Sequence, residues 1–184
     1  MLAKSSLPLI LTLLASGVVA SAQGMQSVYT TLRVGKCKTL GERESFRSME
    51  CPGVAGYKLQ VEVHDITETL TVIGTDGSKH GLGVGHVGRG GFPAIGTRAE
   101  WRVRRERGKL VPVALIVRVT VSEYAGGDAP RREVSYLTVT KITPQEICIT
   151  KSILAGRNSN MKARRLADKS AGEPCYEPSG PAGP

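Results

Sequence analysis

The stretch Leu110-Val-Pro-Val-Ala-Leu-Ile-Val-Arg-Val-Thr-Val-Ser-Glu-Tyr124 alternates along most of its length. Its odd positions form an unbroken apolar series, Val111, Val113, Leu115, Val117, Val119 and Val121, with Arg118, Thr120 and Ser122 opposite. A β-strand places alternate side chains on opposite faces, whereas a helix would scatter this series around its axis. The stretch therefore predicts a long strand with one buried face. Pro112 favours a strand start or an edge, where its missing N–H does least harm.

Further strands are predicted on both sides of this stretch. Residues 100–106 alternate with Trp101 and Val103 inward, and Arg107-Gly108-Lys109 provides a turn back to residue 110. The other β-prone segments are residues 57–64, 67–73, 134–142 and 146–151. Short polar connections separate them, and Asp65-Ile66 suits a tight hairpin reversal. The expected result is an antiparallel meander.

One helix is predicted near the C-terminus, at about residues 158–171. The segment 158–160, Asn-Ser-Asn, offers N-cap oxygens, and Gly172 and Pro174 end the helix. One side of the helix collects small and apolar side chains, Ala163, Leu166, Ala167 and Ser170. The predicted fold class is α+β: mainly an antiparallel β-sheet or small β-sandwich with one C-terminal α-helix. We expect a single domain over residues 23–172 and a Pro/Gly-rich tail over 173–184, anchored at Cys175.

The first 22 residues have the pattern of a signal peptide. Lys4 precedes an apolar run over residues 7–19, and the run ends in Ala20-Ser-Ala22, which is typical of a cleavage site. Thirteen apolar residues are too few to span a bilayer comfortably, which disfavours the alternative of an uncleaved anchor. Cleavage after Ala22 would leave 162 residues with no transmembrane segment. The expected location is periplasmic or secreted.

Four cysteines belong to the predicted mature chain, at positions 37, 51, 148 and 175. An oxidising compartment would couple an even number of them, and three pairings are possible. We favour Cys37 with Cys51 and Cys148 with Cys175, because each pair joins neighbours in sequence. A metal site is the alternative, but the chain has no C-x-x-C and its histidines lie far from every cysteine in sequence.

The chain is basic, with a formal net charge of +9 that falls to +8 when Lys4 leaves with the leader. Segment 98–109 contains six Lys and Arg residues but only two Glu, and segment 151–169 contains six more Lys and Arg residues but only one Asp. If the helix packs beside the Trp101 strand, the clusters form one cationic face able to hold phosphate or carboxylate groups. The candidate contacts are Arg98, Arg102, Arg104, Arg105, Lys162, Arg164 and Arg165. The alternative is a solvated face without a partner.

A glycine-rich segment, residues 74–96, is the other candidate for function. Nine of its 23 residues are Gly, and residues 83–88 match the dinucleotide-binding pattern G-x-G-x-x-G. No helical pattern follows, so the segment is interpreted as a loop, either closing over a ligand or flexible and without function. His80 and His86 in this loop are the candidates for a small hydrolase site.

Several short motifs are distributed over most of the mature chain. They are Val28-Tyr-Thr-Thr-Leu32, Lys36-Cys37, Cys51-Pro-Gly53 with Gly56-Tyr57, Ile95-Gly96 with Glu100-Trp-Arg102, Ala114-Leu-Ile-Val-Arg118, Leu137-Thr-Val-Thr-Lys141, Asn158, Asn160 and Ala163-Arg-Arg-Leu-Ala-Asp168. In combination they resemble a group of small exported alphaproteobacterial proteins. The resemblance implies export, the two local disulfides and a β-rich body ending in a helix. It implies no catalytic chemistry.

The sequence therefore favours an exported, non-catalytic binding or interaction protein of the bacterial cell envelope. Its expected partner is an anionic envelope component or another protein. Specific nucleic-acid binding is disfavoured, because aromatic residues make up only 4% of the chain. Two alternatives remain open: a small periplasmic hydrolase that uses the 74–96 loop, and a protein inhibitor of an envelope or host enzyme. No residue is assigned to catalysis, a cofactor or a metal.

Overall fold

The computed structural model describes residues 24–89, 91–123 and 130–176. They form two five-stranded antiparallel sheets and an α-helix. Sheet A has the strand order β1-β7-β8-β9-β10, and sheet B has the order β2-β3-β4-β5-β6. The bounds are β1 (Gln26–Thr31), β2 (Lys38–Arg43), β3 (Phe46–Pro52), β4 (Lys58–His64), β5 (Thr67–Ile73), β6 (Lys79–Gly81), η1 (Val84–His86), β7 (Phe92–Glu106), β8 (Lys109–Glu123), β9 (Arg132–Ile142), β10 (Ile147–Leu154), α1 (Ser159–Ala167) and η2 (Ser170–Gly172). The predicted leader, residues 1–22, and tail residues 177–184 lie outside the described residues.

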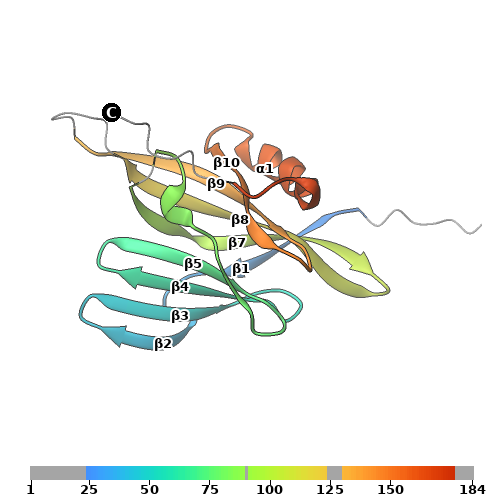
Figure 1. The fold of residues 1–184 in the computed structure, drawn as a ribbon, viewed down its shortest axis with the longest axis horizontal. Helices are drawn as coiled ribbons and strands as arrows, with labels where there is room; N and C mark the ends of the chain where they lie inside the picture. Colours follow the sequence, from blue (N-terminus) through green and yellow to red (C-terminus); the bar gives the residue numbers. More distant parts are fainter. Residues whose placement is uncertain (1–23, 90, 124–129, 177–184) are drawn as a thin grey trace, which may run out of the picture.

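The elements form three layers. Figure 1 shows sheet B stacked against sheet A, with α1 on the opposite side of sheet A. Within each sheet, β2 to β6 and β7 to β10 follow one another as meanders, and β1 joins the edge of sheet A beside β7. The predicted fold class, an α+β protein built as a small antiparallel β-sandwich with one C-terminal helix, is confirmed.

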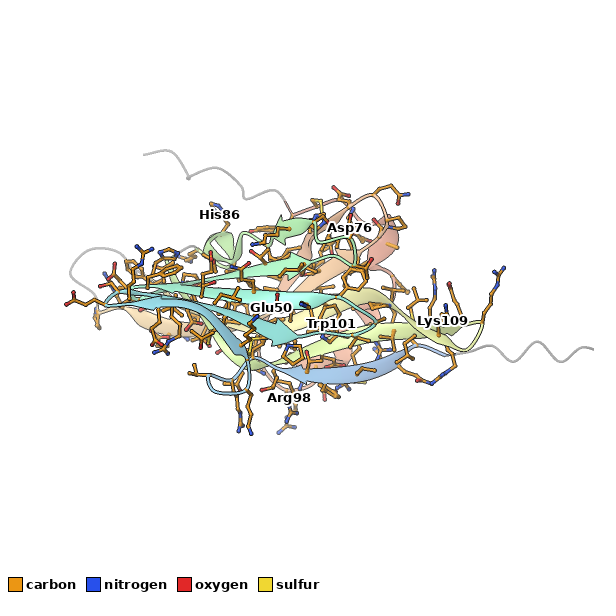
Figure 2. All side chains as sticks on the ribbon, turned by 90° about the horizontal axis from the view of Figure 1, so that it is seen from below. Glu50, Asp76, His86, Arg98, Trp101 and Lys109 are labelled. Atoms are coloured by element: carbon orange, nitrogen blue, oxygen red, sulfur yellow. A yellow bond between two sulfur atoms is a disulfide. The ribbon has the colours of Figure 1, made fainter. Side chains whose placement is uncertain are left out.

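The space between the sheets holds the main hydrophobic core, and β8 contributes four of the six residues of its predicted face, whereas Val111 and Val113 lie outside this core. Leu115, Val117, Val119 and Val121 are at most 1% exposed, opposite Leu59, Val61, Leu70 and Val72 of sheet B. Trp101 of β7 is fully buried in the same layer (Figure 2), and its Nε1 donates a hydrogen bond to Thr30 Oγ1 at 2.9 Å. The predicted inward placement of Trp101 is therefore correct.

A second, smaller core lies between sheet A and α1. Ala163 and Ala167 of the helix pack on Ala114, Ile116, Leu137 and Val139. Small helical side chains let the helix axis approach the sheet closely, because little volume separates the two backbones. This core explains why the even positions 114 and 116 of β8 are apolar. The outer face of sheet A is covered here and becomes polar beyond the helix, from Arg118 onward.

The hairpin turns follow the sequence prediction. His64 pairs with Thr67 across Asp65-Ile66, and Glu106 pairs with Lys109 across Arg107-Gly108. Asp65 has φ 52°, Arg107 has φ 47° and Gly108 has φ 81°. Such left-handed backbone matches the twist of two-residue hairpins, and Gly adopts it without steric strain.

The glycine-rich segment 74–96 is not the continuous loop that its composition predicts. It contains β6, η1 and the beginning of β7. Backbone pairing needs no side chains, so glycine does not prevent these elements from forming. Gly88 has φ +67°, and a Cβ there would lie 2.4 Å from Glu123 Oε1 and 2.6 Å from the Tyr136 ring. Close packing therefore requires glycine at this position.

Two disulfides link neighbours in sequence, as predicted: Cys37 with Cys51, and Cys148 with Cys175. The first joins the residue before β2 to β3, and the second joins β10 to the segment after α1 and η2. Disulfides of this kind are typical of proteins that mature in an oxidising compartment. Among the described residues, no helix has the length and apolar character needed to cross a membrane.

Candidate functional site

The two basic clusters meet on the outer face of sheet A, because α1 packs there. Arg102 and Glu100 of β7 both contact this helical segment. The structure does not, however, place the seven predicted contact residues on one free surface. Among the depressions in the described part of the chain, one is lined by two of the seven, Arg98 and Arg164.

Arg102 has a structural role in the described fold. Its Nε and Nη2 donate to the two carboxylate oxygens of Asp168 at 2.7 and 3.0 Å, and its Nη1 donates to Ser27 Oγ at 2.5 Å. The residue is only 7% exposed. Because its guanidinium is occupied on two sides and shielded from solvent, Arg102 joins the end of α1 to sheet A instead of presenting a charge to a partner.

The remaining predicted contacts lie elsewhere. Arg104 pairs with Glu106, and Arg105 donates to the Gly108 carbonyl at 3.0 Å, so both belong to the β7–β8 hairpin end. Lys162 and Arg165 are exposed on α1 but do not line the depression. Arg165 contacts the sulfur of Met161 at 3.6 Å.

The depression that Arg98 and Arg164 share is a groove of about 350 Å³ on the outer face of sheet A. It crosses four neighbouring strands and reaches the first turn of α1. The lining residues are Tyr29, Gly96, Thr97, Arg98, Glu100, Ile116, Arg118, Leu137, Asn160 and Arg164. Three guanidinium groups therefore face one carboxylate, above a floor that contains two aliphatic side chains. We call this the basic groove.

A bulge in β7 shapes the groove. The pairing with β8 shifts between Ile95 and Ala99, so three residues of β7 lie opposite the single residue Arg118. A Cβ on Gly96 would lie 3.0 Å from Arg118 Cβ, which explains the need for glycine. The Thr97 carbonyl accepts a hydrogen bond from Leu32 N at 3.0 Å, which fixes the bulge to the end of β1.

The bulge places Arg98 at the surface beside β1. Its guanidinium carbon lies 5.4 Å from the centroid of the Tyr29 ring, and Figure 2 shows the side chain projecting from the sheet. Arg118 is exposed on the neighbouring strand and forms no ion pair with any residue that the structure describes. These two arginines can therefore take a ligand without breaking an internal salt bridge.

Arg164 is held in place from two sides. It donates to Glu100 at 2.5 and 3.3 Å and to the Tyr29 hydroxyl at 2.8 Å. Burial of Glu100 alone would raise the pKa of this carboxyl, but the hydrogen bonds from Arg164 and Ser27 outweigh burial, and the pKa lies below its ordinary value. The hydrogen bond to Glu100 raises the pKa of Arg164. Both groups are therefore charged at neutral pH.

Replacement of Glu100 by Gln tests this arrangement through the pH dependence of stability. Because the folded-state pKa of Glu100 is lowered, its contribution is present above the ordinary value of 4.5 and is lost as pH falls through the folded pKa. We expect Glu100→Gln to reduce the free energy of unfolding near neutral pH by about 2 kcal/mol. Below pH 4.5 the difference from the parent should shrink.

Urea denaturation over a series of acidic buffers measures this difference. The exposed Glu106, which pairs with Arg104 at the hairpin end, provides a matched control as Glu106→Gln. That control should change stability by less than about 1 kcal/mol. A constant difference between parent and Glu100→Gln across the acidic range would contradict the assigned role of Glu100.

The histidines of the glycine-rich segment lie away from the basic groove. Figure 2 shows His86 and Asp76 on the opposite side of the molecule from Arg98. Ser78 Oγ lies 3.0 Å from His80 Nε2 and 2.6 Å from Asp76 Oδ1. The hydrogen bonds from the Ser78 side chain and backbone lower the pKa of Asp76. Activation of a serine hydroxyl needs a carboxylate that orients the histidine, whereas this carboxylate contacts the serine.

One cluster in the described part of the chain has the composition of a metal site, namely Glu146, Cys148 and Cys175. Both sulfurs belong to a disulfide, so neither is the thiolate that binds zinc. The cluster therefore has a structural explanation.

Of the ten residues that line the groove, the sequence prediction named only Arg98 and Arg164 as contacts, and Tyr29, Arg118 and Asn160 are among those it missed. Tyr29 belongs to one of the motifs of the resemblance and Asn160 to the predicted helix start, but neither observation points to a binding site. Arg118 does carry a signal, because the alternation of β8 puts it on the face opposite the core. That face is the one on which the outward residues of β7 also lie. The turn alone does not give the position of Arg98 relative to Arg118, because the register of the two strands shifts twice along β7.

No protein-family model matches the chain, and neither the curated proteins nor the solved structures contain a significant match to it.

Proposed function

We propose that the chain is an exported, non-catalytic protein of the bacterial cell envelope that binds an anionic partner in the basic groove. The observation that carries the proposal is the convergence of Arg98, Arg118 and Arg164 on one groove, with a single carboxylate among them. Arg binds both phosphate and carboxylate with two parallel hydrogen bonds, and such pairs are stronger than neutral ones.

The first turn of α1 adds to the same potential. Asn160 lies in this turn and lines the groove, and the turn contains no acidic residue. The N-terminus of a helix carries a partial positive charge, which favours a nearby anion. Because the groove also holds Ile116 and Leu137, it can accommodate an anionic group attached to an apolar or flat portion.

The leader pattern and the disulfides support an extracytoplasmic role. Signal peptides direct export, and the two disulfides fit an oxidising compartment. The resemblance to small exported alphaproteobacterial proteins agrees with this location. In a bacterial envelope, phosphate and carboxylate groups are the abundant anionic groups that such a groove would meet.

Charge-removing variants in the groove test the proposal. Arg98→Ala and Arg118→Ala should each weaken binding of pyrophosphate by about tenfold, because each removes one charge-assisted contact. Citrate serves as the carboxylate probe in the same titration calorimetry. Binding of either probe by the parent should also weaken as salt rises from low to physiological concentration.

Lys109→Ala is the matched control, since it removes one positive charge at the β7–β8 hairpin end (Figure 2) and should leave affinity unchanged. An equal loss of affinity in Lys109→Ala and Arg118→Ala would mean that binding depends on the net charge of the protein and not on the groove. Affinity independent of salt, or of both arginines, would overturn the proposal.

A further inference from the structure

The basic groove continues beyond Arg98 into a second depression of about 580 Å³. The two share Tyr29, Thr97 and Arg98 and therefore adjoin. The second one is lined in addition by Thr30, Thr31, Arg33 and Lys36, at the end of β1 and in the loop that leads to β2. Pockets that take small organic molecules have volumes of about 300 to 1,000 Å³, so each depression is large enough for a ligand group of its own.

The loop that carries Arg33 and Lys36 is fixed at both ends. Lys36 N donates to the Arg33 carbonyl at 3.0 Å, and Arg33 N donates to Thr31 Oγ1 at 3.2 Å. The next residue, Cys37, is joined to β3 through its disulfide. The two basic side chains are exposed, so the backbone is ordered while the charges face solvent.

Along the whole path, five basic residues face one acidic residue. The basic residues are Arg118, Arg164, Arg98, Arg33 and Lys36, and the acidic one is Glu100, which already pairs with Arg164. The hydroxyls of Thr31 and Thr97 add hydrogen-bond donors along the path. A single small anion would meet the charges at one end only.

We infer that the groove binds a linear chain of phosphate groups, which runs from Arg118 past Arg98 to Arg33 and Lys36. This inference rests on the proposed function and extends it to a substrate class. Successive phosphates would place one negative charge after another along the path, and each guanidinium can bind one of them with two hydrogen bonds.

The direction of the groove disfavours an acidic peptide as the occupant. The first depression draws its lining from β1, β7, β8 and β9, so it crosses the strands and does not follow the edge of β1. A peptide lying across the strands cannot pair its backbone with the sheet edge, and its amide groups would lack those partners. A phosphate chain has no such donors to satisfy.

Chain length is the variable that tests the inference. Titration calorimetry compares pyrophosphate, tripolyphosphate and a longer polyphosphate on the parent, on Arg33→Ala/Lys36→Ala and on Arg105→Ala/Lys109→Ala. The last variant also removes two positive charges, but at the distant hairpin end between β7 and β8. For the parent we expect affinity to rise at least about tenfold from pyrophosphate to the longer chain, since two further charged contacts form.

Arg33→Ala/Lys36→Ala should lose this gain and keep the affinity for pyrophosphate, and the hairpin variant should keep both. No gain with length, or a gain that survives in Arg33→Ala/Lys36→Ala, would overturn the inference while leaving the proposed function intact. If the parent protein does not bind pyrophosphate at all, the proposed function itself is refuted.

Two further probes identify the source of the chain. Poly-glutamate that shows the same gain through Arg33 and Lys36 would overturn the inference in favour of an acidic peptide. Oligothymidylate that shows it would support the phosphate chain and point to a nucleic-acid backbone, whereas a gain confined to polyphosphate would support a chain without bases. The latter is the expected result, because Arg98 covers the ring of Tyr29, the one aromatic side chain among the lining residues described.

Discussion

Loss of the Cys148–Cys175 disulfide is expected to lower the free energy of unfolding by about 3.5 kcal/mol. The two cysteines are 27 positions apart, and the loop that they close contains α1 and η2. In the chain-entropy description, opening this loop gives the unfolded state more conformations. The double variant Cys148→Ser/Cys175→Ser measures the effect in urea denaturation, and its melting temperature should fall by about 10 °C.

The second disulfide provides the comparison. Cys37 and Cys51 are 14 positions apart, so Cys37→Ser/Cys51→Ser should lose slightly less, about 3 kcal/mol. Reductant should destabilise either double variant once more, through the bond that remains. Unfolding of both variants at the urea concentration of the parent would contradict the expectation. The two variants should also differ in anion binding. The Cys37–Cys51 disulfide lies next to Lys36, whereas the Cys148–Cys175 disulfide closes the loop that contains α1.

The sandwich could be predicted because its central strands display simple alternation. β8 and the β4–β5 hairpin have one face in the core between the sheets, and in each of these strands apolar residues occur at every second position. The same reasoning does not reach the beginning of β7. There the bulge between Ile95 and Ala99 adds residues that break the alternation, and Gly96 contributes no side chain to the pattern. The exposed edge strand β2 gives no signal, because neither of its faces is buried.

The candidate site could be predicted only as a tendency of charge. The sequence has many arginines in the segments of β7 and α1, but it does not show which of them form ion pairs with a carboxylate. Asp168 neutralises Arg102, while Glu100 holds Arg164 at the rim of the groove. This distinction depends on the position of α1 over sheet A, which is a tertiary property. Arg33 and Lys36 join the groove for the same reason, since β1 pairs with β7 across about 70 positions of sequence.

Replacement of Asp168 by Asn should destabilise the protein by about 3 kcal/mol, the lower end of the range for breaking a buried ion pair. The side chain of Arg102 is 8% exposed and that of Asp168 is 29% exposed. Asn offers one acceptor oxygen where Asp168 accepts two hydrogen bonds, and it carries no negative charge to balance the buried guanidinium of Arg102. Urea denaturation measures the change, and Glu106→Gln is again the exposed control.

The helix dipole and the ion pair have opposite effects on the stability of Asp168→Asn, so the sign of the measured change shows which is larger. Asp168 is the C-cap of α1, where a negative charge is unfavourable, so its neutralisation alone would stabilise the helix by about 0.5 kcal/mol. Stabilisation in Asp168→Asn would therefore show that the pair with Arg102 contributes little. The double variant Arg102→Met/Asp168→Leu removes both charges of this pair and should recover most of the lost stability.

The same variants connect the helix anchor to the groove. Asp168 does not line the groove, but α1 carries both Arg164 and Asn160 into it. If the Arg102–Asp168 pair positions α1, pyrophosphate binding should weaken in Asp168→Asn and recover in the double variant. Unchanged binding in a destabilised Asp168→Asn protein would mean that the Glu100–Arg164 pair alone positions the helix. The charged pair at the end of α1 would then serve the fold and not the site.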